Sequence, residues 1–152
     1  MQLLELKVPP LIAGVLIGLA MWWSAHWMPA GHAGPLRVVI SGVCAAAGLV
    51  VALLGIWAFR LARTTVDPIH PEGASSVVTR GIFSHTRNPM YVGLTAVLLG
   101  WAVWLWVPWA FLGPLALVLF LTRFQIIPEE RAMRLKFGRD YEDYCERVRR
   151  WL

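Results

Sequence analysis

The fold is decided by residues 88–122, NPMYVGLTAVLLGWAVWLWVPWAFLGPLALVLFLT, which contain no Lys, Arg, Asp or Glu. A single helix over this stretch, rising 1.5 Å per residue, would be about 52 Å long. Because the hydrocarbon core of a bilayer is about 30 Å thick, we expect the stretch to fold back on itself. Trp106-Val107-Pro108-Trp109 is the expected turn, since Pro108 cannot continue the helix before it. The sequence therefore predicts a hairpin of two spans, roughly Met90–Trp106 and Trp109–Leu121.

Two earlier stretches, residues 8–36 and 38–59, also lack these four residue types. They predict spans at about Pro10–Met28 and Val38–Phe59. The first is not expected to be a cleavable signal peptide, because one Lys precedes it and no clear small-x-small cleavage site follows. The chain is 58% hydrophobic and 15% charged, against about 25% charged in soluble domains. The predicted class is an all-α integral membrane protein with about four transmembrane helices, a C-terminal helical hairpin and cytoplasmic amphipathic helices.

The length of 152 residues predicts one membrane domain, with two spans in residues 1–59 and a loop, the hairpin and a tail in residues 60–152. Small residues recur in the first two spans and are expected to pack helix against helix. These residues are Gly14 and Gly18, then Gly42, Ala46 and Gly48. The two cysteines, Cys44 and Cys145, lie in a span and in the tail, so free thiols and no metal site are expected.

The basic residues predict the orientation. Of the fourteen Lys and Arg residues, four lie between residues 60 and 87 and eight follow Leu121. Four spans place both groups on one side, and the positive-inside rule makes that side cytoplasmic, together with both termini. The net charge of +5 is therefore attributed to orientation and anionic lipid headgroups, not to nucleic acid. Six tryptophans are expected at the outer interface: Trp22, Trp23, Trp27, Trp104, Trp106 and Trp109.

Helix initiation explains only some of the residues at the start of the third span. Asn88 is a preferred N-cap and Pro89 is preferred at the first helical position. Helix initiation does not account for Arg87, Tyr91 and Gly93. Because a helix N-terminus favours anions and Arg87 adds a positive charge, a ligand carboxylate or phosphate is expected there.

The tail predicts two further helices. Pro128 suits the start of the first, Gly138 breaks it, and Asp140 is expected to cap the second. Apolar and aromatic residues recur at steps of three and four, which predicts an amphipathic face lying on the membrane or against the loop. These residues are Met133, Phe137, Tyr141, Tyr144, Val148 and Trp151.

The adjacent carboxylates Glu129 and Glu130 need a separate explanation. Carboxylates close to a bilayer are costly unless they meet cations or hydrogen-bond donors. Arg123 and Arg131 are the structural partners expected from the sequence, and a cationic ligand is the alternative.

Five motifs follow one another in a fixed order around the charge-free hairpin. They are Thr64-Thr65-x-x-Pro68, Val78-Thr79-x-Gly81-Ile82-Phe83, Arg87-Asn88-Pro89-Met90-Tyr91-Val92-Gly93, Glu129-Glu130 and Phe137-Gly138-x-x-Tyr141-x-x-Tyr144. The series resembles the isoprenylcysteine carboxyl methyltransferase family and, more loosely, the phospholipid N-methyltransferases. The resemblance covers about residues 60–150.

This resemblance implies a membrane methyltransferase that uses S-adenosylmethionine without a Rossmann sheet, and the chain indeed has no GxGxxG motif. The cofactor-lining positions that it implies are Arg87, Asn88, Pro89, Tyr91 and Gly93, closed from the other side by Glu129 and Glu130 with Tyr141. The family usually has His at position 88. Asn88 carries no titratable group, so no acid–base role is expected of it.

The chemistry of S-adenosylmethionine fits these residue types. Arg87 and the helix start are expected to take the carboxylate, while Glu129 or Glu130 takes the ammonium or the ribose. Tyr141 or Phe137 is expected to cover the adenine. For the methyl acceptor we expect Glu130 and Arg123 to set the orientation, because an in-line displacement depends on alignment.

A site at the membrane surface predicts a lipophilic acceptor: a prenylcysteine-like carboxylate, a thiol or a phospholipid amine. Only an amine needs a carboxylate to receive a proton. Two other functions stay open at this point, a membrane reductase using a reduced nicotinamide cofactor and a non-catalytic membrane protein of the same fold. The pair Glu129-Glu130 favours a cationic cofactor. A bacterial inner membrane is the expected location.

Overall fold

The computed structural model describes residues 5–27, 34–62 and 76–152, which form helices and connections and contain no strand. The first motif of the resemblance, Thr64-Thr65-x-x-Pro68, lies outside the described residues. The elements are α1 (Pro10–His26), α2 (Pro35–Leu61), η3 (Gly81–Ser84), α3 (Pro89–Leu105), η4 (Pro108–Phe111), α4 (Leu112–Leu121), η5 (Thr122–Ile126), α5 (Ile127–Phe137) and α6 (Arg139–Arg147).

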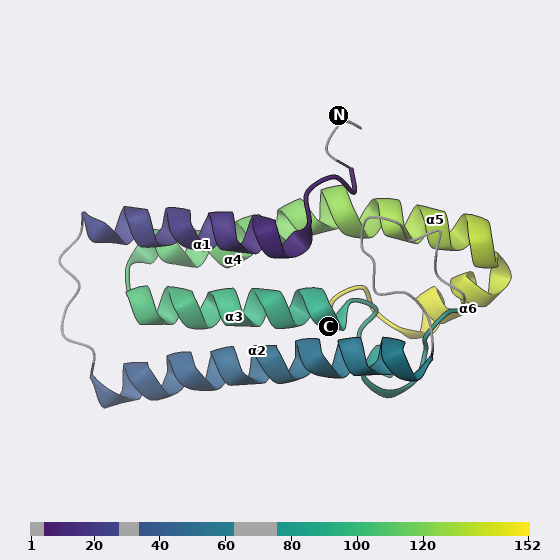
Figure 1. Cartoon of the computed structure of the whole chain (residues 1–152), viewed down its shortest axis with the longest axis horizontal. Helices are drawn as coiled ribbons and strands as arrows, with labels where there is room; N and C mark the ends of the chain where they lie inside the picture. Colours follow the sequence, from purple (N-terminus) through teal and green to yellow (C-terminus); the bar gives the residue numbers. More distant parts are fainter. Residues whose placement is uncertain (1–4, 28–33, 63–75) are drawn as a thin grey trace.

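The four apolar helices lie lengthwise beside one another, with α3 between α2 and the pair formed by α1 and α4 (Figure 1). The end of α1, the start of α2 and the turn between α3 and α4 share one end of the bundle. The end of α2, the start of α3 and the α5–α6 region share the other end. The tryptophans of α1 and of the α3–α4 turn therefore gather opposite the basic tail, as the sequence predicts.

Within the described residues, two helices are long and apolar enough to cross a bilayer: α2 and the continuous run Pro108–Phe137. α1 and α3 are apolar but have 17 residues each, so the number of spans stays a prediction. Large apolar side chains such as Leu16, Val43 and Leu53 are exposed on the outer faces of the bundle. This all-helical bundle with an apolar surface is the architecture of a membrane protein.

The predicted hairpin turn is confirmed. α3 ends at Leu105, and Trp106 takes a left-handed conformation with φ 56°. Val107 is extended, and Pro108 then opens η4 at its first position. The turn therefore lies where Pro108 forbids continuation of α3.

Pro128 lies in the first turn of α5, as the sequence predicts, but the helix before it continues into α5 without a break. α4 does not end the span, because it runs through the π-helical turn η5 into α5 as one helix, visible as the long ribbon labelled α4 and α5 in Figure 1. Pro128 has no N–H to donate to the carbonyl of Phe124, four residues before it. The backbone N–H of Leu6 donates to that carbonyl instead, at 3.0 Å. A segment distant in sequence thus satisfies the acceptor that Pro128 leaves open.

The tail also differs in detail from the prediction. Gly138, with φ 53°, is the N-cap of α6, while Asp140 lies inside its first turn. α6 ends at Arg147, and the chain then leaves the helix. Five residues of the predicted amphipathic face pack into one cluster with Val77 and Cys145. Of the two contacts predicted for this face, the structure therefore has the one with the loop. The five residues are Met133, Phe137, Tyr141, Tyr144 and Val148. Trp151 packs against the bundle core instead.

The contact between α2 and α3 is a close approach of two backbones. A Cβ placed on Gly48 would lie 2.5 Å from the carbonyl oxygen of Gly93, and a Cβ on Gly93 would lie 2.8 Å from the Ala52 Cβ. The packing role predicted for Gly48 is therefore confirmed, as it is for Gly14, which faces Leu94. Gly42 has open space around its Cβ position and does not take part.

Candidate functional site

The site is built around the start of α3. Asn88 occupies the predicted N-cap position, but its side chain does not cap the helix. The Nδ2 group instead donates to the backbone carbonyl of Arg150 at 2.9 Å. The Thr86 hydroxyl reaches the same carbonyl at 3.4 Å and also accepts from the Asn88 N–H at 3.2 Å. The side chain at position 88 therefore binds the C-terminal segment.

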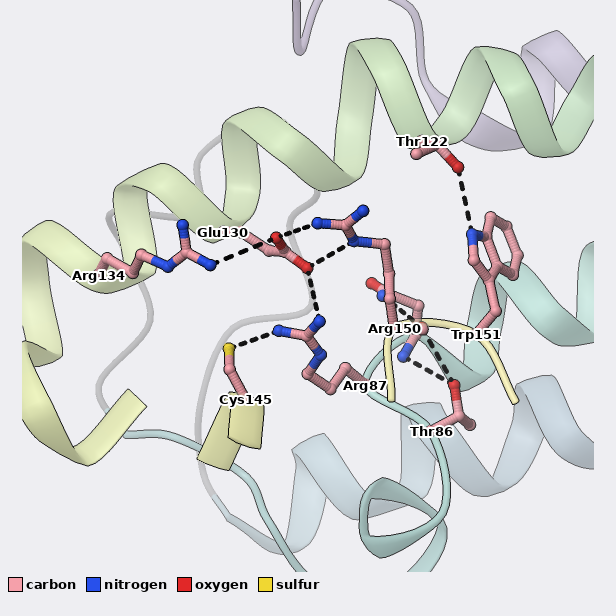
Figure 2. A network of polar contacts seen from close by, with 9 residues as sticks. Thr86, Arg87, Thr122, Glu130, Arg134, Cys145, Arg150 and Trp151 are labelled. Carbon is pink, nitrogen blue, oxygen red and sulfur yellow. Dashed lines mark hydrogen bonds and ion pairs between the residues drawn. The ribbon is translucent and has the colours of Figure 1, made fainter. Parts of the chain in front are cut away.

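The C-terminal segment, residues 148–152, returns across the bundle to cover the start of α3. The carbonyl of Arg149 accepts from the backbone N–H of Arg87 at 3.0 Å. The Trp151 indole donates to the Thr122 hydroxyl at 3.1 Å, which ties the segment to the π-helical turn (Figure 2). Two donors around the start of α3, where an anionic ligand was expected, thus bind carbonyl groups of the chain itself.

Glu130 is the centre of an arginine cluster. It is 4% exposed, and both of its carboxylate oxygens accept from Arg150, from Nε at 2.9 Å and from Nη2 at 2.8 Å. Arg87 lies 3.3 Å from the same carboxylate and Arg134 lies 3.9 Å from it. Figure 2 shows the three guanidinium groups converging on Glu130 from α5, from the start of α3 and from the C-terminal segment. One carboxylate therefore organises three cations.

Arg123 and Arg131 are not partners of this carboxylate, contrary to the structural pairing expected from the sequence. Both pair with Glu5, at 2.8 Å and 3.6 Å. The hydrogen bond from Arg123 lowers the pKa of Glu5 below its usual range. The error has a simple cause, because the residues nearest in sequence lie on other faces of the helix.

Glu129 has a different environment. The Tyr91 hydroxyl donates to its carboxylate, which joins α5 to α3. Among the described residues, no Lys or Arg lies within ion-pair distance of Glu129. The two adjacent glutamates therefore differ in their partners. Glu130 is surrounded by arginines, whereas Glu129 accepts a hydrogen bond from Tyr91 and can accept others.

Tyr141 lies on α6 at the side of this cluster. Its ring centroid is 6.1 Å from that of Tyr144, whose hydroxyl donates to the Phe83 carbonyl at 2.7 Å. Burial raises the pKa of both phenols above the ordinary range, so they are neutral donors at physiological pH. Cys145, also on α6, accepts a hydrogen bond from Arg87 Nη1.

Two other predicted site residues lie deeper in the bundle. Pro89 is fully buried at the first position of α3, and Gly93 faces Gly48 and Ala52 of α2. The structure therefore brings together Arg87, Asn88, Tyr91, Glu129, Glu130 and Tyr141, whereas Arg123 lies with Glu5.

A groove opens beside Glu130, with a volume of about 550 Å³. Arginines and glutamates line it, between apolar side chains: Ile127, Glu130, Arg131, Arg134, Leu135, Glu142 and Arg150. Its size lies within the usual range for small-molecule sites.

A family model for phospholipid methyltransferases matches residues 36–140, which include α2, the hairpin, both glutamates and the start of α6. The chain belongs to the phospholipid methyltransferase family.

Two groups of relatives agree with this membership. A probable protein-S-isoprenylcysteine O-methyltransferase of rice, in both the indica and the japonica subspecies, is 34% identical over 111 residues. That match covers 66% of this chain and 56% of the rice protein, so the chain spans about half the length of these relatives. An uncharacterized protein of Haemophilus influenzae is 43% identical over 63 residues, which are 41% of this chain and all of that protein. No solved structure matches.

The resemblance to isoprenylcysteine carboxyl methyltransferases is thereby confirmed, and the family supports a membrane methyltransferase. Three members of the cluster are not predicted from the sequence: Arg150, Arg134 and Cys145. Arg150 lies 20 residues from Glu130 in the sequence, and only the return of the C-terminal segment joins them. No local spacing signal marks such a pair.

Arg150→Ala is expected to lower the free energy of unfolding of the protein by about 1.5–3 kcal/mol, the range for hydrogen bonds to charged groups. Glu130 would keep Arg87 and Arg134, so the carboxylate would not be left without cations. Unfolding in detergent micelles measures this difference. Arg149→Ala is the matched control, because its side chain is exposed and only its backbone carbonyl is used. Equal stability of the two variants would contradict the pairing.

Proposed function

We propose that this protein transfers a methyl group from S-adenosylmethionine to a lipophilic acceptor at the cytoplasmic face of the membrane. The observation that carries the proposal is the unequal environment of the two glutamates. Glu129 bonds to Tyr91 without a cationic partner, while Glu130 fixes the arginines around the neighbouring groove.

S-adenosylmethionine, when bound, supplies the methyl group on a sulfonium centre. A cationic cofactor fits a site whose carboxylate lacks a cation, because an unpaired buried or half-buried carboxylate gains from an opposite charge. Glu129 and Tyr91 are proposed to bind the cofactor, together with Tyr141, which lies on α6 near Glu130 and Arg87. Arg87 and Asn88 are proposed to support the site without contacting the cofactor. Arg87 pairs with Glu130, and Asn88 binds the C-terminal segment.

Pro89 and Gly93 contribute by position. Pro89 sets the start of α3, and Gly93 allows α3 to approach α2 closely. Both residues therefore determine the position of Tyr91 relative to Glu129. Because Arg123 pairs with Glu5, orientation of the acceptor is proposed for Glu129 and Tyr91 rather than for Arg123 and Glu130.

The acceptor classes are a prenylcysteine-like carboxylate, a thiol and a phospholipid amine. An acceptor with a long apolar chain would suit the exposed apolar faces of α2 and α4. If the acceptor is an amine, Glu129 is the carboxylate with capacity to receive its proton. The basic end of the bundle supports a cytoplasmic site and cytoplasmic termini in a bacterial inner membrane.

Glu129→Gln is expected to weaken binding of S-adenosylmethionine at least about tenfold, or about 1.4 kcal/mol. The amide keeps the shape and can still bond to Tyr91, but it has lost the charge. Calorimetric titration of the purified protein in detergent measures the affinity, with Glu146→Gln, an exposed glutamate of α6, as the matched control. Reduced nicotinamide dinucleotides are titrated beside it. Binding of those dinucleotides in place of S-adenosylmethionine would overturn the proposed function in favour of a reductase.

A further inference from the structure

The long helix formed by α4 and α5 contains the π-helical turn η5, which lies between the apolar α4 and the two glutamates of α5. Turns of this kind are rare and occur frequently at functional sites. We propose that η5 sets the helical register of the methyl-transfer site, and that Pro128 and Gln125 are positioning residues because they maintain this turn. The inference rests on the proposed function and adds residues that act through Glu129 and Glu130.

The turn contains one residue more than an α-helical turn. The backbone N–H of Ile127 donates to the carbonyl of Thr122, which lies five residues earlier instead of four. If the same residues formed a regular α-helix, the chain after the turn would be rotated by about 100° and shifted by about 1.5 Å relative to α4. α4 cannot follow this rotation, because Leu117 and Leu121 are fully buried in the core of the bundle. The rotation would therefore fall on α5.

The contacts of the two glutamates depend on this register. Glu129 accepts from the Tyr91 hydroxyl of α3. Glu130 pairs with Arg87 and Arg150, as Figure 2 shows. A rotation of about 100° is more than a quarter of a turn, so it would move both carboxylates away from these partners.

The C-terminal segment binds the helix at the start of the turn and again beyond its end. The Trp151 indole donates to the Thr122 hydroxyl at 3.1 Å, and the neighbouring Arg150 donates to Glu130 at 2.8 Å (Figure 2). Because Arg150 and Trp151 are consecutive, both contacts can form only while Thr122 and Glu130 keep their present separation and orientation. The segment therefore favours the π-helical register.

Pro128 excludes the α-helical alternative. In a regular α-helix the N–H of residue 128 would donate to the carbonyl of Phe124, but proline has no N–H and its ring would clash with that carbonyl. In the structure the Phe124 carbonyl accepts from the N–H of Leu6 at 3.0 Å. Leu6 has φ 57°, a left-handed conformation that is uncommon for a residue with a side chain. Pro128 and Leu6 together thus favour the π-helical turn.

The N-terminal segment, residues 5–9, binds two further residues of the turn. Gln125 is 1% exposed, and its Nε2 group donates to the Val8 carbonyl at 3.1 Å. Arg123 donates to Glu5 at 2.8 Å. A buried amide that lost its acceptor would be left unsatisfied, which is unfavourable, so the bond to Val8 fixes the orientation of Gln125. With Leu6, the segment therefore binds three consecutive residues of the turn.

Two variants of different helix length test the register. Both lack the Pro128 ring and the Gln125 amide: one is Pro128→Ala with Gln125→Leu, and the other is Pro128→Ala with Gln125 deleted. In the substitution variant the turn can become α-helical and rotate α5, so the affinity for S-adenosylmethionine should weaken about tenfold. In the deletion variant a regular helix that is one residue shorter returns both glutamates to their partners, so the affinity should lie within about twofold of the wild type.

Calorimetry on the full chain in detergent measures these affinities. Pro114→Ala removes a proline of α4 outside the turn and is the matched control, which should bind as the wild type does. Equal affinities of the substitution and deletion variants would overturn the assignment. A weaker affinity of the deletion variant would overturn it as well, because that is the result expected if the turn only contributes to stability.

Hydrogen exchange gives a second measure that does not depend on the cofactor. The Arg87 N–H donates to the Arg149 carbonyl, and Glu130 holds the adjacent Arg150. Exchange of the Arg87 N–H should be about tenfold faster in the substitution variant and unchanged in the deletion variant. If the wild-type protein does not bind S-adenosylmethionine, the proposed function fails and the exchange rates alone decide the register. Equal exchange rates in the two variants would then overturn the assignment.

Discussion

Glu130→Gln is expected to lower the free energy of unfolding by about 3–5 kcal/mol, the cost of removing one partner from a buried ion pair. The carboxylate is 4% exposed and meets Arg87, Arg134 and Arg150. Without it, three guanidinium groups would repel one another with no anion between them. The C-terminal segment, which Arg150 ties to α5, should then detach from the start of α3.

Unfolding of the purified protein in detergent micelles measures this loss, with Glu146→Gln as the exposed control. Glu130→Asp keeps the charge and should recover part of the stability. A Glu130→Gln variant as stable as the control would rule out the arginine cluster as a stabilising element.

Gly93→Ala is expected to destabilise the protein by about 3 kcal/mol, the upper end of the usual cost of overpacking. The added methyl group would lie 2.8 Å from both the Ala52 Cβ and the Ala52 backbone nitrogen, and against the Gly48 carbonyl oxygen. Backbone atoms cannot rotate away, so α2 and α3 would have to separate along their contact.

Gly42→Ala is the matched control for this variant. It lies on α2 with nothing within 4 Å of its Cβ position, so it should be neutral or stabilising by up to about 1 kcal/mol, as Ala is favoured over Gly in helices. Thermal unfolding of both variants in the same detergent measures the difference. Equal stability of Gly93→Ala and Gly42→Ala would contradict the backbone contact and return Gly93 to a direct role in the cofactor site.

The hairpin could be predicted because its causes are local. A charge-free stretch longer than the bilayer is thick must turn, and Pro108 marks the position at which an α-helix cannot continue. The N-cap at Asn88 follows from the same kind of rule, and the structure has it there. The order of the motifs likewise identified the family before any contact was known.

The helix around Pro128 could not be predicted from the local sequence. Proline predicts the first turn of a helix, and α5 has Pro128 there, yet α5 also continues α4 without a break. The carbonyl of Phe124, which Pro128 leaves without its usual donor, receives the N–H of Leu6, and the π-helical turn accommodates the ring. The outcome depends on a donor more than a hundred residues away, which no window of sequence around Pro128 contains.

The sequence by itself determined the class, the family, the hairpin and the residue types of the site, since these depend on composition, spacing and local backbone limits. Only the tertiary structure decided which cations meet which carboxylates: Arg123 with Glu5, and Arg150 with Glu130. Ion pairing depends on distance in space, and the returning C-terminal segment brings Arg150 to a carboxylate that lies 20 residues earlier in the chain.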